Sequence, residues 1–220
     1  MVALAKLYQD RFETTGVSKR DRVWKVLCED FFNHRISPEA RVVDLACGYG
    51  DFINNVRCAK KLAVDLNPDA RRHLNRDVEF TLAPATELGR LGANSADVVF
   101  TSNFLEHLKD KEECDAVLSS VFDVLKPGGR FIVMGPNIRF AYREYWDFYD
   151  HYLPLSDLSL AEGLRLAGFE IAENIAQFLP FTMNGKTPTR DFLVRLYLKM
   201  PLAWKVMGKQ FLVTAEKPCS

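Results

Sequence analysis

Two glycines early in the chain could bring a ligand close to the backbone. Gly48 and Gly50 follow the short apolar run 41–45, which predicts a buried strand. Glycine permits a tight turn and a close approach of the backbone to a ligand. A predicted helix over residues 51–58 would direct its N-terminal N–H groups at this turn, which is a favourable position for a carboxylate. These residues therefore predict a turn that receives an anionic group of a ligand.

An acidic residue in the next predicted strand adds a second ligand-binding group. Asp65 ends the apolar run 62–65 and stands about twenty residues after Asp44. A carboxylate at this spacing can accept hydrogen bonds from both hydroxyls of a ribose. The glycine turn together with Asp65 predicts an adenosine-type cofactor. Two simpler interpretations stay open, because the glycines could form only a connection and Asp65 could only cap a helix.

The details of the turn favour a nucleoside over a dinucleotide. A dinucleotide fingerprint would place a third glycine at position 53, where this chain has Ile53. A phosphate-binding loop would need Gly-Lys followed by Ser or Thr at this turn, and neither Gly48 nor Gly50 is followed by such a run. A nucleoside that carries an amino-acid carboxylate suits this turn better than a pyrophosphate does.

Two histidines are candidates for proton transfer. His107 follows the predicted fourth strand, and His151 lies in the segment 136–155, which follows the predicted fifth strand. Histidine is the natural general base near neutral pH. We prefer His151 as the base and take His107 as the second candidate. Glu106 and His107 could instead cap or anchor the loop that follows them.

The segment 136–155 interleaves aromatic with charged side chains, and we expect it to overhang the active cleft. Aromatic faces next to polar groups suit stacking on a ring-shaped or sugar acceptor. We predict that Tyr145, Trp146 and Tyr149 bind the acceptor. The alternative is a packed lid that does not contact the substrate.

Elements that alternate between strand and helix are expected to position these residues. Such alternation indicates an α/β fold, a doubly wound and mostly parallel sheet with helices on both faces. The predicted strands cover 41–45, 62–65, 78–81, 97–101 and 131–134, and the predicted helices between them cover 51–58, a segment beginning at Pro68, and 110–125.

The last third of the chain departs from this repeating unit. The sequence predicts a helix over 156–167, a strand from 169 and a last edge strand over 210–215, with an insertion at 177–207. Within the insertion, a basic amphipathic helix is predicted over 188–200. Residues 188–204 could thus lie on a membrane or grip a lipid-linked substrate, although a helix packed on the sheet explains the pattern equally well.

Composition narrows the classes of protein. The chain has 220 residues with 29 basic and 29 acidic side chains, which fits one globular domain and gives no global field for nucleic acid. The five cysteines contain no C-x-x-C pair, so we expect a cytoplasmic protein without disulfides and without a bound metal. No secretory signal and no membrane-spanning run is recognisable.

Four motifs resemble those of class I S-adenosylmethionine-dependent methyltransferases of the small-molecule type. The segment 42–50 resembles their first motif, and 63–67 is similar to their ribose-binding motif. The run 97–100 continuing into 104–108 looks like their fourth-strand motif, and 125–131 resembles the turn before their fifth strand. Together the motifs extend over about half of the chain, residues 41–137. The resemblance implies a seven-stranded sheet whose final strand is antiparallel.

The resemblance also implies roles for individual residues toward S-adenosyl-L-methionine. Ala46 replaces the more usual first glycine, and Pro84 stands near a position where the family often has an acidic residue that contacts adenine. Recognition there would have to come from backbone groups or from Thr86. The implied cofactor-binding residues are Asp44, Ala46, Gly48, Gly50, Asp65, Leu66, Asn67, Pro84, Ala85, Thr86, Asn103 and Phe104.

We therefore predict an enzyme that methylates a small-molecule acceptor, with a hydroxyl of a glycan, a lipid-linked compound or a natural product as the expected site. RNA or protein methylation is the first alternative, and a non-catalytic S-adenosylmethionine-binding protein is the second. A single domain over 1–220 is expected to contain a helical cap (1–40), a cofactor-binding core (41–137), an aromatic lid (138–155) and the insertion (177–207). The sequence does not indicate the oligomeric state.

Overall fold

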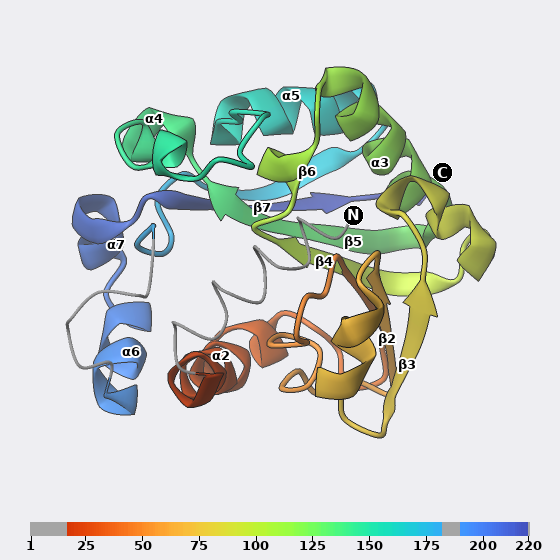
Figure 1. Cartoon of the computed structure of the whole chain (residues 1–220), viewed down its shortest axis with the longest axis horizontal. Coiled ribbons are helices and arrows are strands. Elements are labelled where there is room, and N and C mark those ends of the chain that lie inside the picture. The colour runs from red at the N-terminus through yellow and green to blue at the C-terminus, as the bar shows by residue number, and fades with distance from the viewer. Residues whose placement is uncertain (1–16, 182–189, 220) are drawn as a thin grey trace.

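The computed structural model describes residues 17–181 and 190–219, which form a seven-stranded sheet with helices on both faces (Figure 1). The strand order is β3-β2-β1-β4-β5-β7-β6. β1 to β5 are parallel, and β7 runs antiparallel to both β5 and β6. The predicted fold class is confirmed. The strands are β1 (Arg41–Leu45), β2 (Lys60–Asp65), β3 (Val78–Leu82), β4 (Ala96–Ser102), β5 (Leu125–Pro136), β6 (Glu170–Ile175) and β7 (Gln210–Glu216).

The last strand is not an edge strand, so this detail of the sequence prediction is wrong. β7 pairs with β5 on one side and with β6 on the other. The alternation of polar and apolar residues in β7 is misleading because Gln210 and Thr214 are themselves buried. The edges of the sheet are β3 and β6, and the side chains of β6 alternate in exposure as expected for an edge.

One face of the sheet is covered by η3 (Ala85–Leu91), α3 (Lys111–Val124) and α5 (Asp157–Leu166), which lie over a core of Val, Leu and Phe side chains. Asp110 caps α3 by accepting a hydrogen bond from the Glu113 amide, and Ser156 caps α5 in a reciprocal pair with Ser159. Gly168, with φ +97°, ends this helical segment, as the sequence predicts.

The opposite face is covered by α2 (Val17–Asp30), η1 (Phe32–His34), α6 (Asp191–Leu198) and α7 (Pro201–Met207). The core under these helices is aromatic. Phe52 stacks on Phe100 with ring centroids 3.7 Å apart, and Trp24 packs edge-on against both rings. The described part of the predicted helical cap is thus helical and joined to the sheet, while residues 1–16 lie outside the described residues.

Several predicted helices are shorter than the sequence suggests. The predicted helix over 51–58 is a hydrogen-bonded turn over 50–56, because Asn54 and Asn55 use their side-chain amides on backbone oxygens. The helix after Asn67 is the 3-10 helix η2 (Pro68–His73). The helix predicted over 188–200 is the shorter α6; α7 begins after the predicted range, and residues 188 and 189 lie outside the described residues.

Three short helices complete the side of the fold at which β4 and β5 end: η4 (Leu105–His107), α4 (Ile138–Ala141) and η5 (Tyr145–Asp147). α4, α7 and α6 lie at the same end of the molecule (Figure 1). In the part of the chain that the structure describes, no helix is both long and apolar enough to cross a membrane.

Candidate cofactor and acceptor site

The loop after β1 has an unusual backbone. Ala46, Gly48 and Gly50 have φ values of +55°, +54° and +76°. The Cys47 amide donates a hydrogen bond to the Val64 carbonyl of β2, and the Gly50 amide donates to the Cys47 carbonyl, so the loop curls back over the end of the sheet. Left-handed backbone at Ala46 costs about 1–2 kcal/mol relative to its right-handed form. Such strain concentrates at functional loops.

Asp65 joins this loop to the loop after β2. Its Oδ2 accepts a hydrogen bond of 2.8 Å from the Gly48 amide, and its Oδ1 accepts one of 2.8 Å from the Asn67 amide. Burial raises the pKa of Asp65, and the backbone hydrogen bonds act in the opposite direction. A carboxylate oxygen accepts more than one hydrogen bond, so both oxygens retain capacity for the hydroxyls of a ribose. Gly48 and Asp65, which the sequence predicts to bind the same ligand, are therefore in direct contact.

Asp44 occupies a different environment from the other predicted cofactor-binding residues. Its side chain is buried, and the Ile53 amide donates a hydrogen bond to it. Burial raises its pKa well above the usual range. The geometry makes Asp44 a support of the turn. Whether it also contacts the cofactor stays a prediction.

The residues predicted to contact adenine lie around the ends of β2 and β3. Leu66 is 69% exposed, so its side chain is accessible to a flat ring that packs on it. Asn67 caps η2 by accepting from the Asp69 amide. Pro84 precedes η3, and Ala85 packs against the core beneath it.

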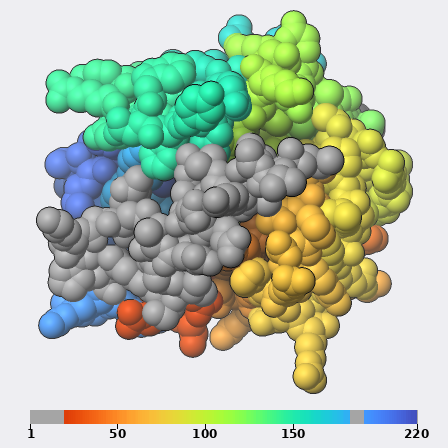
Figure 2. All heavy atoms as spheres, in the orientation of Figure 1, coloured from red at the N-terminus to blue at the C-terminus, as the bar shows by residue number. Residues whose placement is uncertain are grey.

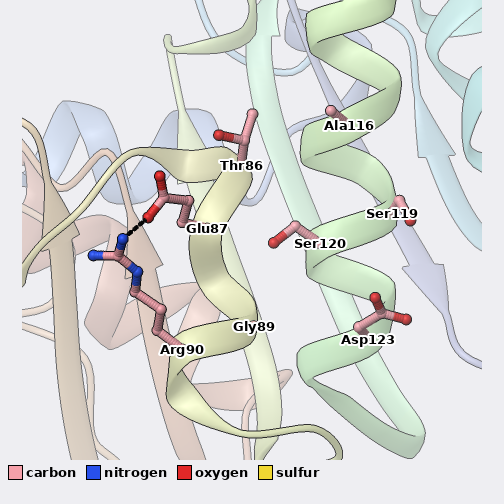
Figure 3. A pocket seen from close by; sticks show the side chains of 8 residues that line it. All are labelled: Thr86, Glu87, Gly89, Arg90, Ala116, Ser119, Ser120 and Asp123. Atoms are coloured by element: carbon pink, nitrogen blue, oxygen red, sulfur yellow. Dashed lines mark ion pairs between the residues drawn. The ribbon is translucent and has the colours of Figure 1, made fainter.

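Thr86 lines a groove between η3 and α3 (Figure 3). The groove has a volume of about 460 Å³, and its other wall carries Ala116, Ser119 and Ser120 of α3. The remaining lining residues of the groove include Glu87 and Arg90, which form an ion pair. The predicted contact of Thr86 with the cofactor stays a prediction, since its side chain lines this flank.

The end of β4 lies on the other side of β1, where the order of the strands reverses. Asn103 has φ +51° and is exposed, and its backbone N–H donates a hydrogen bond to the Met134 carbonyl of β5. Phe104 precedes η4 and is partly buried. Thr101 fixes the end of β4 to that of β1 by donating to the Leu45 carbonyl at 2.8 Å. Open α/β sheets bind ligands in the crevice at such a reversal.

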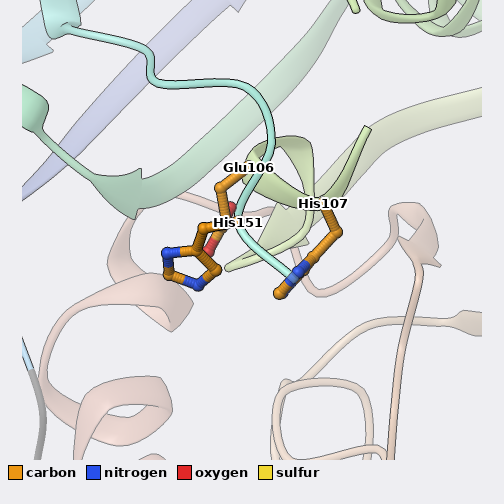
Figure 4. A group of neighbouring side chains, drawn as sticks. All are labelled: Glu106, His107 and His151. Atoms are coloured by element: carbon orange, nitrogen blue, oxygen red, sulfur yellow. The ribbon is translucent and has the colours of Figure 1, made fainter. Parts of the chain in front are cut away.

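Glu106, His107 and His151 form a compact group beside this crevice (Figure 4). Glu106 and His107 come from η4, whereas His151 comes from the loop after η5. The Nδ1 atom of His107 lies 2.8 Å from the carbonyl oxygen of Asp150 and 3.3 Å from its Oδ2. The two imidazole rings meet edge to face with centroids 5.0 Å apart. Sequence analysis placed both histidines near the site but missed Asp150 as the partner of His107.

The group is buried and electrostatically coupled. Burial raises the pKa of Glu106 to about 7, with His107 lowering it and Asp150 raising it. Burial and the Glu106 charge also raise the pKa of Tyr145 above its usual range. One potential ligand atom from each of Glu106, His107 and His151 lies within 4.8 Å of the others, so the three side chains could hold a metal ion. That this protein uses no metal stays a prediction.

The segment after β5 is tied to this group through its backbone. The Glu106 carbonyl accepts hydrogen bonds from the amides of Tyr152 and Leu153. At its start, the buried Asn137 side chain donates to Asp157 and to the Ala176 carbonyl. The segment 138–155 is therefore held beside the ends of β4 and β5, and its role as a lid over an acceptor stays a prediction.

The three predicted acceptor-binding residues differ in exposure. Trp146 and Tyr149 expose 60% and 90% of their side chains, whereas Tyr145 is fully buried. Tyr145 packs against His151 and Trp146, with ring centroids 4.7 and 5.0 Å away. Trp146 and Tyr149 are available to an acceptor. Tyr145 is instead placed to support His151, and its contact with an acceptor stays a prediction.

One aromatic pair beside the loop was missed by sequence reasoning. Tyr49 stacks on His73 of η2 with ring centroids 3.8 Å apart. This contact is a second connection, besides the Asp65 hydrogen bonds, between the loop after β1 and the residues after β2. Neither the spacing nor the type of these two residues signals the contact, since it depends on how η2 folds back.

A doubly wound sheet with a carboxylate bridging the loops after β1 and β2 defines a protein that binds an adenosine-containing cofactor. Comparisons make this more specific, because residues 43–133 match the family described as methyltransferase domain. A demethylmenaquinone methyltransferase of Leptospira interrogans is 29% identical over 143 residues, which are 59% of this chain and 55% of the relative. The chain thus spans about half the length of the curated relatives it matches.

Solved structures share the fold. An S-adenosylmethionine-dependent methyltransferase of Archaeoglobus fulgidus superimposes with a TM-score of 0.68 at 20% identity, covering 96% of this chain and 100% of that chain. A methyltransferase of Thermotoga maritima, described as a possible histamine N-methyltransferase, gives 0.68 at 20% identity, with 97% and 95% covered. Residues 43–133 therefore match a methyltransferase domain, and the described chain has the fold of S-adenosylmethionine-dependent methyltransferases, whose cofactor is S-adenosyl-L-methionine.

Proposed function

We propose that the protein transfers a methyl group from S-adenosyl-L-methionine to a hydroxyl of a small, ring-containing or lipid-linked acceptor. The observation that carries this proposal is the pair formed by His107 and Asp150 at the ends of β4 and β5. A histidine held by a carbonyl and a carboxylate beside a cofactor crevice is the arrangement of a general base. Trp146 and Tyr149 are exposed on the same segment as Asp150 and offer aromatic faces to an acceptor.

Each part of the cofactor would have its own partners. Asp65 would accept hydrogen bonds from the ribose, and Leu66 would pack on adenine. The amino-acid carboxylate would meet the backbone of the loop at Ala46, Gly48 and Gly50, which here ends in a short turn instead of a helix. The fit is good because both oxygens of Asp65 retain acceptor capacity. When bound, S-adenosyl-L-methionine supplies the methyl group as an activated electrophile.

The residues of this chain would orient the acceptor and remove its proton. With Nδ1–H of His107 donating to the Asp150 carbonyl, the lone pair lies on Nε2 and can take the hydroxyl proton of the acceptor. Asp150 would stabilise the imidazolium formed, as the carboxylate does in other oriented histidines. The fully buried Tyr145 and the stacked Phe148 hold His151 as the second candidate base.

A second acceptor chemistry is favoured by the name of the Leptospira relative, which is a demethylmenaquinone methyltransferase. Removing the proton from a hydroxyl on an aromatic ring creates an anion that is nucleophilic at oxygen and at ring carbon. The same base could therefore serve methylation at either atom. Methylation of RNA or protein and cofactor binding without turnover are the competing functions, and a cytoplasmic location without a nucleic-acid partner stays a prediction.

The test is incubation of the full chain with S-adenosyl-L-methionine carrying a labelled methyl group. The candidate acceptors are a reduced demethylnaphthoquinone with an isoprenoid tail, a polyprenyl-linked glycan, total RNA, and fractionated cell extract. We expect label in a small molecule, on an atom identified by NMR, with turnover unchanged after chelator treatment. Label only in RNA or protein, or cofactor binding without transfer to any fraction, would contradict the proposal.

A further inference from the structure

The outer faces of α6 and α7 are apolar and exposed to solvent. Seven large apolar side chains between residues 192 and 207 are exposed, and the fraction reaches 76% for Leu202 and 84% for Val206. Within each helix they follow helical spacing, as Phe192 and Leu196 do in α6. Contiguous apolar surface on this scale marks an interaction site more often than a neutral surface. The full set is Phe192, Leu193, Leu196, Met200, Leu202, Val206 and Met207.

The opposite faces of the same helices are firmly held, so the exposed side chains do not result from loose packing. The Tyr197 hydroxyl donates to the Phe178 carbonyl at 2.6 Å, and Trp204 Nε1 donates to the Tyr197 carbonyl at 2.8 Å. Arg195 forms ion pairs with Glu29 and Asp30 of α2. The two helices are fixed to the body of the protein and present their apolar side outward.

Positive charge flanks the apolar side chains. Residues 190–207 contain four basic side chains and one acidic side chain, although the whole chain has a formal charge of zero. Arg195 faces α2, whereas Arg190, Lys199 and Lys205 are exposed to solvent. Apolar side chains rimmed by cations are the signature of a helix that lies in the interface of an anionic membrane.

The same end of the molecule carries the aromatic segment of the candidate site. α4 lies close to α7 in Figure 1, and an ion pair between Lys209 and Glu144 connects the end of α7 to the segment after α4. Trp146, Tyr149 and Tyr152 are exposed in that segment. Tryptophan and tyrosine are enriched where proteins meet the membrane–water interface.

We propose that the outer face of α6 and α7 docks on the surface of a bilayer containing anionic lipids. The apolar side chains enter the interface, and Lys199 and Lys205 contact the headgroups. Combined with the proposed function, this places the acceptor site at the membrane, where a lipid-linked acceptor is concentrated. The docking itself rests on α6 and α7 alone and does not require the enzyme to be active.

The test is co-sedimentation of the full chain with vesicles of phosphatidylcholine alone or mixed with phosphatidylserine. We expect binding to the mixed vesicles that weakens with salt. Leu202→Ser combined with Val206→Ser should reduce the partition coefficient at least tenfold, because two exposed side chains lose most of their apolar contact with the membrane. Lys199→Ala should reduce it about fivefold on anionic vesicles only. The matched control is Leu158→Ser with Leu166→Ser, two exposed leucines of α5 that should change nothing.

Three outcomes would overturn the docking. The first is that the wild type does not bind anionic vesicles. The second is that the α5 and α7 double variants lose binding equally. The third is that the wild type does not bind vesicles but forms a dimer in sedimentation equilibrium, and that only the α7 double variant dissociates this dimer. The last outcome would assign the face to a second copy of this chain. S-adenosyl-L-methionine affinity and turnover of a water-soluble acceptor, measured on the same variants, should stay unchanged, so failure of docking and failure of the proposed function are distinguishable.

Discussion

His107 in η4 and Asp150 in the segment after β5 are joined by a contact of 2.8 Å between Nδ1 and the Asp150 carbonyl oxygen, with Oδ2 of Asp150 at 3.3 Å. The two residues are far apart in the sequence, and their contact joins the segment after β4 to the segment after β5. A carbonyl acceptor at Nδ1 fixes the neutral imidazole with its proton on that nitrogen. The lone pair then lies on Nε2, on the side of the ring away from Asp150.

Replacing His107 should affect turnover much more than cofactor binding. For His107→Gln we expect a loss of turnover of at least about 100-fold, the lower range for a lost general base. Affinity for S-adenosyl-L-methionine, measured calorimetrically, should change less than about twofold, a small fraction of a typical hydrogen bond. His34→Gln, at an exposed histidine of η1, is the matched control and should leave both quantities unchanged.

The same measurements on His151→Ala decide between the two candidate bases. Loss of turnover in this variant with a normal pH profile in His107→Gln would identify His151 as the base. Full activity of both variants across the pH range would remove general base catalysis by either histidine.

Glu106 should make the stability of the protein fall as the pH rises. Burial raises its pKa from 4.5 to about 7, so ionisation of this carboxyl is costly in the folded state. The stabilisation relative to an ionised carboxyl is complete below pH 4.5 and is lost as the pH rises through about 7, a total of about 3 kcal/mol. The titratable groups facing Glu106 are His107, His151, Asp150 and Tyr145.

The measurement is the free energy of unfolding in urea for the wild type and for Glu106→Gln. The difference between the two proteins should shift by about 3 kcal/mol in favour of the variant between roughly pH 5 and pH 8.5. A difference that stays constant over this range would show that the Glu106 carboxyl is not held neutral by its surroundings.

Much of the fold, and the contact between the loops after β1 and β2, follow from the sequence because both depend on local signals. The apolar runs of β1 and β2 mark buried parallel strands; Gly48 and Gly50 lie in the loop after β1, and Asp65 is the last residue of β2. In a parallel sheet, residues that follow neighbouring strands must meet at one edge. The contact between the Gly48 amide and Asp65 is therefore a consequence of topology that a sequence can reveal.

Other features could not be read from the sequence because they depend on tertiary contacts. β7 lies inside the sheet because it pairs with β6, and the insertion 177–207 separates these two strands in the sequence. The pairing of His107 with Asp150 depends on the path of the segment after β5. The prediction of a helix over 51–58 is wrong because the sequence pattern does not show that the side-chain amides of Asn54 and Asn55 donate hydrogen bonds to backbone oxygens.

Gly50 in the first loop should tolerate substitution by alanine poorly. Its φ of +76° costs an alanine about 1–2 kcal/mol, and an added Cβ would lie 2.5 Å from Cδ2 of Leu74. Gly50→Ala should therefore lower the free energy of unfolding by at least about 1 kcal/mol. Gly89→Ala in η3 is the matched control, because nothing lies within 4 Å of its added Cβ. Equal stabilities of the two variants in urea titrations would contradict the assigned backbone strain.

Asp65 provides the most direct test of the cofactor seat. Asp65→Ala should weaken S-adenosyl-L-methionine binding at least tenfold, or about 1.4 kcal/mol, since hydrogen bonds from ribose to a charged group are lost. The variant also leaves the amides of Gly48 and Asn67 without their acceptor, so its thermal midpoint must be measured alongside. Asp65→Asn keeps the shape and should still weaken binding, because one oxygen becomes an amide donor. Asp77→Ala, at an exposed carboxylate paired with Lys61, is the matched control and should bind normally. Unchanged cofactor affinity in a folded Asp65→Ala protein would contradict the role of this carboxylate.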